Sequence, residues 1–107
     1  MLTLRYFLTT NGRSPFQDWF VELEPTARAR IATALARLGQ GNISQVKSVG
    51  EGVLEYRIEF GPGYRVYFGR DGDVLVILLT GGTKKRQQRD IDQAKVMWLS
   101  YKKRTRG

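Results

Sequence analysis

The chain has 107 residues, the size of one domain with a single hydrophobic core. Hydrophobic residues make up 41% of it and aromatic residues 11%, which is typical of globular proteins and not of disordered ones. It has no cysteine and no histidine, which excludes disulfides and thiolate metal sites and removes the commonest acid–base catalyst at neutral pH. We therefore expect one domain over residues 1–107 without metal or cofactor, in which any catalysis uses other polar side chains.

Positive charge is the most prominent property of the sequence. There are 18 Lys and Arg against 10 Asp and Glu, a net charge of +8, and residues 84–107 alone hold nine basic and two acidic residues. This balance favours a polyanionic partner, most often nucleic acid, although a basic surface can also aid solubility or meet an acidic protein. No apolar run approaches the roughly 18 residues of a membrane span, and the N-terminus lacks a secretory signal, so we expect a cytoplasmic protein with no membrane partner.

The N-terminal half predicts one strand and two helices. Residues 2–8 alternate as in a strand, and Ser14 then starts a helix as its N-cap, with Pro15 at the first helical position and Gln17 completing a capping box. A second helix follows Pro25 and ends at Gly39, so the short connection predicts a helical hairpin. The apolar stripes of the two helices consist of Phe16, Trp19, Phe20 and Leu23, and of Ala27, Ile31, Ala34, Leu35 and Leu38.

The C-terminal half predicts three strands and a helix. Residues 39–52 form a loop with a short extended piece near 46–49, and strands 54–60 and 64–68 follow, around a Gly-Pro-Gly turn. Asp71-Gly72 is a hairpin signal, and residues 74–80, apolar on both faces, predict a covered strand. The order β-α-α-β-β-β-α indicates an α+β fold with an antiparallel sheet packed on helices. The stripe of the last helix consists of Ile91, Ala94, Met97, Trp98 and Tyr101.

Polar residues occupy one face of the hairpin at residues 54–68. A three-residue turn would pair Phe60 with Tyr64, and this register places Glu59 opposite Arg65 and Arg57 opposite Tyr67. The next hairpin would then set Val76 beside Tyr67 and Leu78 beside Arg65. Two hypotheses remain open: a phosphate-binding concavity, or a cross-strand ion pair of Glu59 and Arg65 among solvated charges, which would contribute about a few tenths of a kcal/mol.

The cations Lys84, Lys85 and Arg86 follow the last strand and precede the last helix. One interpretation is a solvated helix start, but cations oppose the helix dipole there at a cost of about a few tenths of a kcal/mol. That unfavourable placement is a modest indication that the cluster binds an anion.

Three stretches carry a resemblance to a known family: SPFQDWFVEL, VLEYRIEFGPGYRVYF and VLVILLTGGTKKRQQRDIDQAKVMW. Together they resemble toxins of the RelE/ParE superfamily, in particular the HigB-like, phage-related addiction module killer proteins. The resemblance covers nearly the whole chain and implies a RelE-like fold, with an N-terminal helical hairpin packed on a twisted antiparallel β-sheet and a C-terminal helix. The positions that match the family pattern are Leu54, Glu55, Tyr56, Arg57, Gly63, Tyr64, Arg65, Leu78, Leu79, Gly81, Gly82, Lys84, Gln87, Asp90, Ile91 and Ala94.

The resemblance implies the toxin of a type II toxin–antitoxin module, held inactive by a cognate antitoxin, which we expect to be a small helix-turn-helix protein from the adjacent gene. RelE- and HigB-like members cut mRNA on the ribosome and inhibit translation, whereas ParE-like members inhibit DNA gyrase. The basic sheet face favours the first activity, a ribosome-dependent mRNA endonuclease. The alternatives are a gyrase inhibitor and a non-enzymatic basic module that binds nucleic acid.

The resemblance also implies site residues. Arg65, Arg57 and either Lys85 or Lys84 match basic positions that bind and stabilise the reacting phosphate in RelE-like toxins. Glu55 is our candidate for the base, and Glu59 would orient Arg65. The tyrosine of RelE corresponds to Ile91 here, and the histidine of HigB-like relatives has no counterpart, so the sequence does not identify the general acid. The expected RNA contacts are Tyr67, by hydrogen bonding or stacking, with Arg86 and Arg89, and the basic end YKKRTRG is either a ribosomal RNA contact or a frayed tail.

Overall fold

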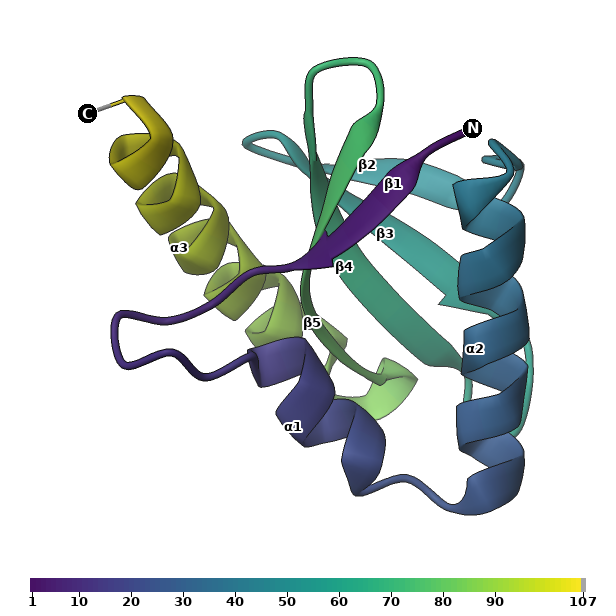
Figure 1. Ribbon diagram of the computed structural model, residues 1–107. Coiled ribbons are helices and arrows are strands. Elements are labelled where there is room, and N and C mark those ends of the chain that lie inside the picture. The colour runs from purple at the N-terminus through teal and green to yellow at the C-terminus, as the bar shows by residue number, and fades with distance from the viewer. Residues whose placement is uncertain (107) are drawn as a thin grey trace.

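The structure, a computed structural model, describes residues 1–106, without the side chain of residue 106 (Figure 1). Within these residues, five strands and three α-helices make up an α+β domain, which is the fold class that the sequence predicts. In chain order the elements are β1 (Thr3–Tyr6), α1 (Pro15–Val21), α2 (Pro25–Gly39), β2 (Val46–Gly50), β3 (Val53–Ile58), β4 (Tyr64–Asp71), β5 (Leu75–Thr83), the 3-10 helix η1 (Lys84–Arg86) and α3 (Gln87–Arg106). The predicted C-terminal helix is thus confirmed, and the last residue of the basic end lies outside the described part.

The strands form one sheet in the order β1-β5-β4-β3-β2. Strands β2 to β5 pair antiparallel, but β1 pairs parallel with β5, so the prediction of a wholly antiparallel sheet is wrong at this edge. The reason is that β1 is joined to the rest of the sheet by a long crossover through α1 and α2, which allows a parallel neighbour where a tight turn would not. The extended piece expected near residues 46–49 is a fifth strand, β2.

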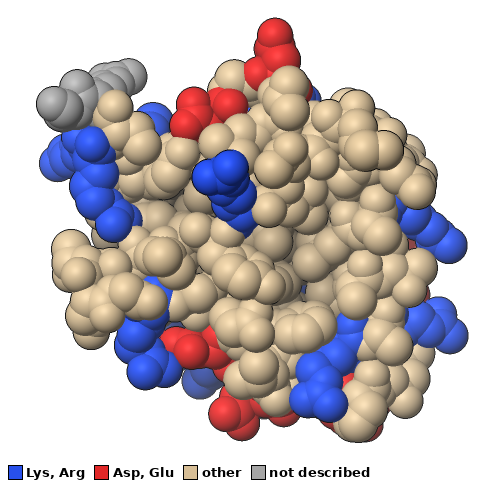
Figure 2. All heavy atoms as spheres, in the orientation of Figure 1, with Lys and Arg blue, Asp and Glu red and all other residues tan. Residues whose placement is uncertain are grey.

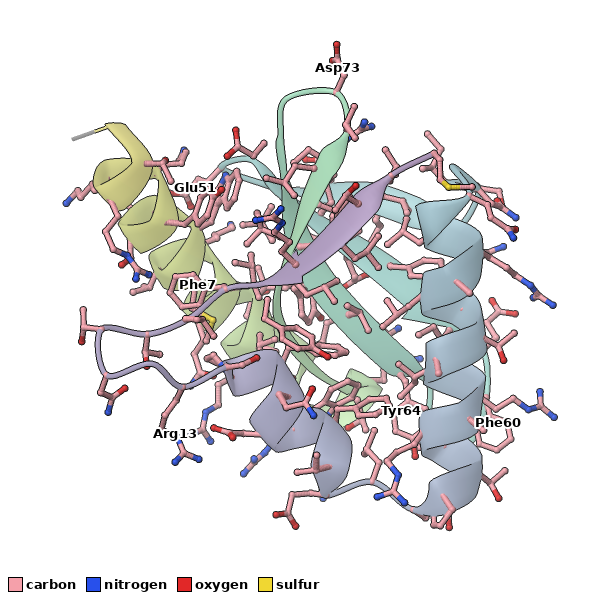
Figure 3. The ribbon with its side chains drawn as sticks, in the orientation of Figure 1. Phe7, Arg13, Glu51, Phe60, Tyr64 and Asp73 are labelled. Atoms are coloured by element: carbon pink, nitrogen blue, oxygen red, sulfur yellow. The ribbon has the colours of Figure 1, made fainter. Side chains whose placement is uncertain are left out.

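Helices cover both faces of the sheet (Figure 1). The helices α1 and α2 lie on one face and α3 lies on the other, so the sheet is the middle layer of three. Tyr64 and Phe60 lie on the side of α1 and α2 (Figure 3). The core on that side includes Phe16, Ile31, Leu38, Tyr56, Ile58, Val66, Phe68 and Leu78, and the core under α3 includes Phe7, Val53, Tyr67, Ile77, Leu79, Ile91, Ala94 and Trp98.

The helix boundaries follow from local chemistry. Ser14 is the N-cap of α1, because its Oγ accepts a hydrogen bond from the backbone N–H of Gln17 at 3.0 Å. The other half of the predicted capping box is absent: the side-chain Oε1 of Gln17 is buried and has no hydrogen-bond partner among the described residues. Pro25 occupies the first turn of α2, and Gly39 is its last residue, as predicted.

The register of the β3–β4 hairpin differs from the prediction by two residues. Ile58 pairs with Tyr64 and Arg57 with Arg65, so the loop comprises residues 59–63 and not three residues. Gly61 and Gly63 both have positive φ, of 56° and 82°, which allows this wider loop. Because a shift of two keeps each side chain on its face, Arg57 and Arg65 still share a face with Tyr67. The predicted pairs of Glu59 with Arg65 and of Arg57 with Tyr67 are wrong.

The β4–β5 hairpin is also longer than predicted. Asp71 pairs with Leu75 across a three-residue loop, and an irregularity between Tyr67 and Phe68 shifts the remainder of the ladder. Tyr67 therefore lies opposite Thr80 and Arg65 opposite Gly82, not beside Val76 and Leu78. This register brings the end of β5, and the cations that follow it, to the same end of the sheet as Arg65.

Two adjacent glycines in β5 allow helices to approach the sheet from both sides. A Cβ atom on Gly81 would lie 2.3 Å from the ring of Trp19 in α1, and one on Gly82 would lie within 3 Å of the Asp90 carboxylate in α3. Real Cβ atoms do not approach other atoms so closely. The Gly81-Gly82 pair is thus a packing requirement of the three-layer fold.

The charged side chains are unevenly distributed over the surface. On the face shown in Figure 2, most of the surface is uncharged, and the Lys and Arg side chains are separate from one another: some lie beside α2 and towards the C-terminal end of α3, others in the upper centre and along the lower part of the view. No helix within the described residues is long and apolar enough to cross a membrane.

Candidate functional site

A buried carboxylate lies at the centre of the polar end of the sheet, under the start of α3. The side chain of Glu55 on β3 is only 1% exposed. Its Oε2 accepts a hydrogen bond from the Tyr67 hydroxyl at 2.9 Å and another from the Gln87 side-chain amide at 2.8 Å. Because Gln87 is the first residue of α3, this contact ties the helix to the sheet. We call this group, with the two cations described next, the Glu55 network: Lys47, Glu55, Arg65, Tyr67 and Gln87.

Two cations flank the Glu55 carboxylate. The Nε of Arg65 lies 3.8 Å from Oε2, and the Nζ of Lys47, on β2, lies 3.7 Å from Oε1. The two differ in burial, since the side chain of Arg65 is 7% exposed and that of Lys47 is 62% exposed. A buried carboxylate of this kind is tolerated only when charges and donors compensate it, and here two donors and two cations do so.

Arg65 is only partly satisfied. Its Nη1 donates a hydrogen bond to the Gly63 carbonyl at 2.8 Å, but its Nε is buried without a hydrogen-bond partner among the described residues. The same Gly63 carbonyl accepts a hydrogen bond from the backbone N–H of Lys84 at 3.1 Å. Arg65 and the start of the Lys84–Arg86 helix are therefore brought together through one oxygen.

Exposed cations lie beside the buried part of the network. Arg57, with its side chain 49% exposed, forms an ion pair with Glu59 at 3.7 Å, which replaces the predicted pair of Glu59 with Arg65. A small pocket of about 130 Å³ lies beside Glu55, with Lys47 and Arg57 among its lining residues. Further exposed cations follow the end of β5: Lys84, Lys85 and Arg86 on η1, and Arg89 in the first turn of α3.

The predicted site residues thus separate into two groups. Glu55, Arg65 and Tyr67 are buried together and in mutual contact, whereas Arg57, Lys84, Lys85, Arg86 and Arg89 are exposed. Tyr67 is completely buried, so its ring presents no exposed face on which a nucleobase could stack, and the hydrogen-bonding role is the one that fits this geometry. Glu55 is likewise covered, so a role as base would require the Gln87 contact to open.

Burial changes the acid–base properties of two groups under α3. The pKa of Tyr67 is raised, first by burial and then by its hydrogen bond to Glu55, so the phenol stays protonated and acts as a donor. Burial also raises the pKa of Asp90, against the opposing effect of Arg86 and Arg89. The Oδ2 atom of Asp90 is buried and has no hydrogen-bond partner among the described residues, which agrees with that direction.

The arrangement supplies donors and positive charge and provides few metal ligands. Within the described residues, no three His, Cys, Asp or Glu side chains are grouped closely enough to hold a metal ion. What the geometry offers is a guanidinium fixed by a carboxylate at the end of a sheet and exposed Lys and Arg around it. Such a group suits the non-bridging oxygens of a phosphate.

The comparisons with known proteins identify a family. The model of the family "Phage derived protein Gp49-like (DUF891)" matches residues 18–98, about three quarters of the chain. The chain belongs to this family. It is also 46% identical, over 83 residues, to an uncharacterized protein from Haemophilus influenzae, and the matched region covers 77% of this chain and 84% of that protein.

The Gp49-like region contains the whole Glu55 network. Sequence reasoning missed two of its members, Lys47 and Gln87, as site residues. Lys47 lies in the short extended piece that the sequence predicts near residues 46–49, and only its pairing with Glu55 across β2 and β3 places it at the site. Gln87 was part of the family pattern, at a regular spacing from Asp90 and Ala94, and that spacing was the available signal that it faces the sheet.

Proposed function

We propose that this Gp49-like protein is the toxin of a type II toxin–antitoxin module and acts as a ribosome-dependent mRNA endonuclease that inhibits translation. The observation that carries the proposal is the position of the Arg65 guanidinium. It is held beside Glu55, and its Nη1 shares the Gly63 carbonyl with the backbone N–H of Lys84, where the exposed cations begin. The membership in a phage-derived family supports a phage-related addiction module. The resemblance to RelE- and HigB-like toxins supports the choice of mRNA as the substrate.

The proposed reaction is a transesterification within the RNA strand. The 2′-oxygen attacks the adjacent phosphorus as its proton is removed, the bond from phosphorus to the 5′-oxygen breaks, and that oxygen takes up a proton. The products are a 2′,3′-cyclic phosphate and a 5′-hydroxyl. Such a reaction needs in-line positioning and donors for the charge that develops on the phosphorane.

Arg65 and the exposed cations beside it supply those donors in this proposal. Arg65 and Arg57 bind the non-bridging oxygens, and Lys84 or Lys85 neutralises the developing charge or protonates the leaving oxygen. Arg86 and Arg89 contact the RNA backbone on either side. Glu55 has a different part from the one that the sequence suggested, since its contacts with Tyr67, Gln87 and Arg65 support a role in holding Arg65 in place.

The proposal includes partners and a location. In the cytoplasm, the ribosome presents the mRNA, and a cognate antitoxin, a small helix-turn-helix protein from the adjacent gene, neutralises the toxin. The net charge of +8 supports association with ribosomal RNA, because each Lys or Arg near a phosphate releases counterions.

The test is primer extension on a defined mRNA in a purified translation system, with the full chain and single variants. We compare Arg65→Ala, Lys84→Ala and Lys85→Ala with the control Arg5→Ala, which removes an exposed arginine of β1. We expect cuts within codons for the wild type and the control. For Arg65→Ala we expect the cleavage rate to fall by about a hundredfold or more. Circular dichroism shows whether each variant is folded. If the wild type arrests growth but makes no cuts on translating ribosomes, the proposal is wrong.

One observation favours a second function, inhibition of DNA gyrase without RNA cleavage. Glu55, Arg65 and Tyr67 are buried, as residues with a purely structural role would be. A gyrase inhibitor would stabilise DNA cleavage complexes in a purified gyrase assay and would keep its toxicity in the Lys84→Ala and Lys85→Ala variants. The same set of variants therefore separates the two functions.

A further inference from the structure

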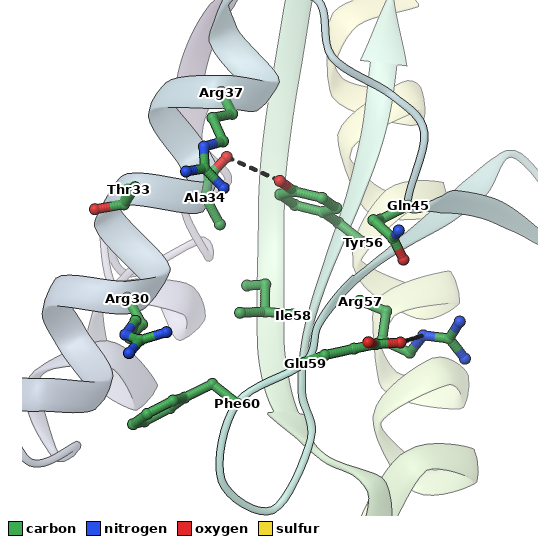
Figure 4. A pocket seen from close by; sticks show the side chains of 10 residues that line it. All are labelled: Arg30, Thr33, Ala34, Arg37, Gln45, Tyr56, Arg57, Ile58, Glu59 and Phe60. Atoms are coloured by element: carbon green, nitrogen blue, oxygen red, sulfur yellow. Dashed lines mark hydrogen bonds and ion pairs between the residues drawn. The ribbon is translucent and has the colours of Figure 1, made fainter.

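A second concave surface lies on the opposite side of β3, between this strand and α2 (Figure 4). Its volume is about 500 Å³. We call it the α2 cleft. Its lining includes three arginines and an apolar floor: Arg30 and Arg37 from α2, Arg57 and Tyr56 from β3, Ile58 and Phe60.

The charges of the α2 cleft are largely unpaired. Within residues 1–106, neither Arg30 nor Arg37 lies within ion-pair distance of a carboxylate, and Glu59, the one acidic residue of the lining, pairs with Arg57. The guanidinium of Arg30 lies over the Phe60 ring, 4.6 Å from its centroid, which holds it at the mouth of the cleft. Two free guanidinium groups beside an apolar floor suit a ligand that carries both phosphates and flat rings.

The α2 cleft continues into the candidate site. Arg57 and Gln45 line both the α2 cleft and the small pocket beside Glu55. Arg30 and Arg37 are seven residues apart on one helix, a distance of about 10 Å along its axis. A polyanionic strand whose charges follow one another at shorter intervals can therefore meet both arginines and also reach Arg57.

We propose that the α2 cleft binds the single-stranded RNA segment adjacent to the phosphate held at Arg65. This inference rests on the proposed function, and it extends the substrate path from one phosphate to several nucleotides. Arg30 and Arg37 contact backbone phosphates, and Arg57 links the cleft to the Glu55 network. The bases rest on the apolar floor next to the Arg30–Phe60 pair, because aromatic and guanidinium planes both stack with bases.

The closing experiment measures binding without cleavage. A fluorescently labelled 2′-O-methyl RNA oligonucleotide cannot undergo the transesterification, and its anisotropy is followed at several salt concentrations. The double variant Arg30→Gln/Arg37→Gln is compared with Arg5→Gln/Arg70→Gln, which removes the same charge from exposed residues of β1 and β4. We expect about tenfold weaker binding for the first and little change for the second, and a salt slope lower by about 1.4 in the first, because two phosphate contacts are lost.

The possible outcomes are distinct. Equal losses in the two double variants would show that only overall charge matters and would overturn the inference. The inference would also be overturned if an acidic peptide, tested as a competitor, bound less tightly to Arg30→Gln/Arg37→Gln while the affinity for RNA stayed the same. In the translation assay, full cleavage by Arg30→Gln/Arg37→Gln would reject the cleft but not the nuclease. Selective loss of binding in a protein that makes no cuts would reject the nuclease and keep the cleft as an RNA-binding site.

Discussion

The two faces of the sheet are built on different principles. The face under α1 and α2 is mainly apolar, and the hydroxyl of its Tyr56 donates a hydrogen bond to a main-chain carbonyl. The face under α3 is apolar at one end, around Trp98, but at the other end it buries Glu55 and Arg65. A fold of this size is stabilised by only about 5–15 kcal/mol, and buried ion pairs are often no better for stability than apolar side chains. The polar end of the α3 face is therefore the part whose composition needs an explanation beyond folding.

Removing the central carboxylate should produce the largest effect on stability. We expect Glu55→Ala to lower the free energy of unfolding by about 3–5 kcal/mol, because it leaves Arg65, Tyr67 and Gln87 without their common acceptor. Urea unfolding followed by circular dichroism measures the change. The matched variant replaces the group by apolar residues, Glu55→Leu/Arg65→Met/Tyr67→Phe, and should lose much less. A triple variant as unstable as Glu55→Ala would mean that the polar group is needed for the fold itself.

The two adjacent glycines of β5 allow the packing of the two sheet faces to be compared, because Gly81 faces α1 and Gly82 faces α3. We expect Gly81→Ala to destabilise the fold by about 1–3 kcal/mol, because the new methyl group collides with the rigid ring of Trp19. Gly82→Ala should cost less, because the atoms it meets belong to the Asp90 carboxylate, which can rotate away.

Gly39→Ala is the control for this pair of glycines. A Cβ atom there would have ordinary contacts of 3.7 Å, so this variant should be neutral or slightly stabilising. Thermal unfolding of the three variants gives the order. A greater loss in Gly82→Ala than in Gly81→Ala would show that the α3 face is the more tightly packed of the two.

The sequence predicted the faces of the sheet better than their pairing. Alternation along residues 54–68 assigned Glu55, Arg57, Arg65 and Tyr67 to one face, and the structure confirms this, although the β3–β4 register was wrong by two residues. The face survives an even shift, because side chains alternate with a period of two. The loop length depended on the backbone angles of Gly61 and Gly63, which composition does not determine.

The burial of the polar face was beyond the sequence pattern. The stripe of Ile91, Ala94 and Trp98 correctly predicted that the last helix packs on something, but it did not specify which face of the sheet. Because α3 covers this face, Glu55, the expected base, is buried and instead contacts Gln87 and Arg65. Lys47 was missed for a similar reason, since its role depends on an edge strand that the sequence showed only as a short extended piece.

A pair of tyrosines gives a finer comparison, with one buried hydroxyl on each face. Tyr67 donates to the Glu55 carboxylate at 2.9 Å, and Tyr56 donates to the Ala34 carbonyl at 3.0 Å. We expect Tyr67→Phe to cost about 1.5–3 kcal/mol and Tyr56→Phe about 0.5–1.5 kcal/mol, because bonds to charged acceptors contribute more. Urea unfolding of both variants measures the two losses in the free energy of unfolding. Equal losses would mean that Arg65, Lys47 and Gln87 compensate Glu55 without the phenol.

The smallest expected effect is a pH dependence that belongs to the α3 face. Burial raises the pKa of Asp90 above its unfolded value of 3.8, so the folded state holds this proton more tightly than the unfolded state. The contribution to stability is therefore fully present below pH 3.8 and is lost as the pH rises through the raised pKa of the folded state.

The variant Asp90→Asn removes this titration and keeps the size of the side chain. We expect the difference in free energy of unfolding between the variant and the wild type to shift in favour of the variant as the pH rises through that window, and to be constant at neutral pH and above. Urea unfolding at a series of pH values measures it. A difference that stays constant throughout would mean that the nearby Arg86 and Arg89 offset the burial of Asp90, in which case the start of α3 is held to the sheet by Gln87 and not weakened by a buried charge.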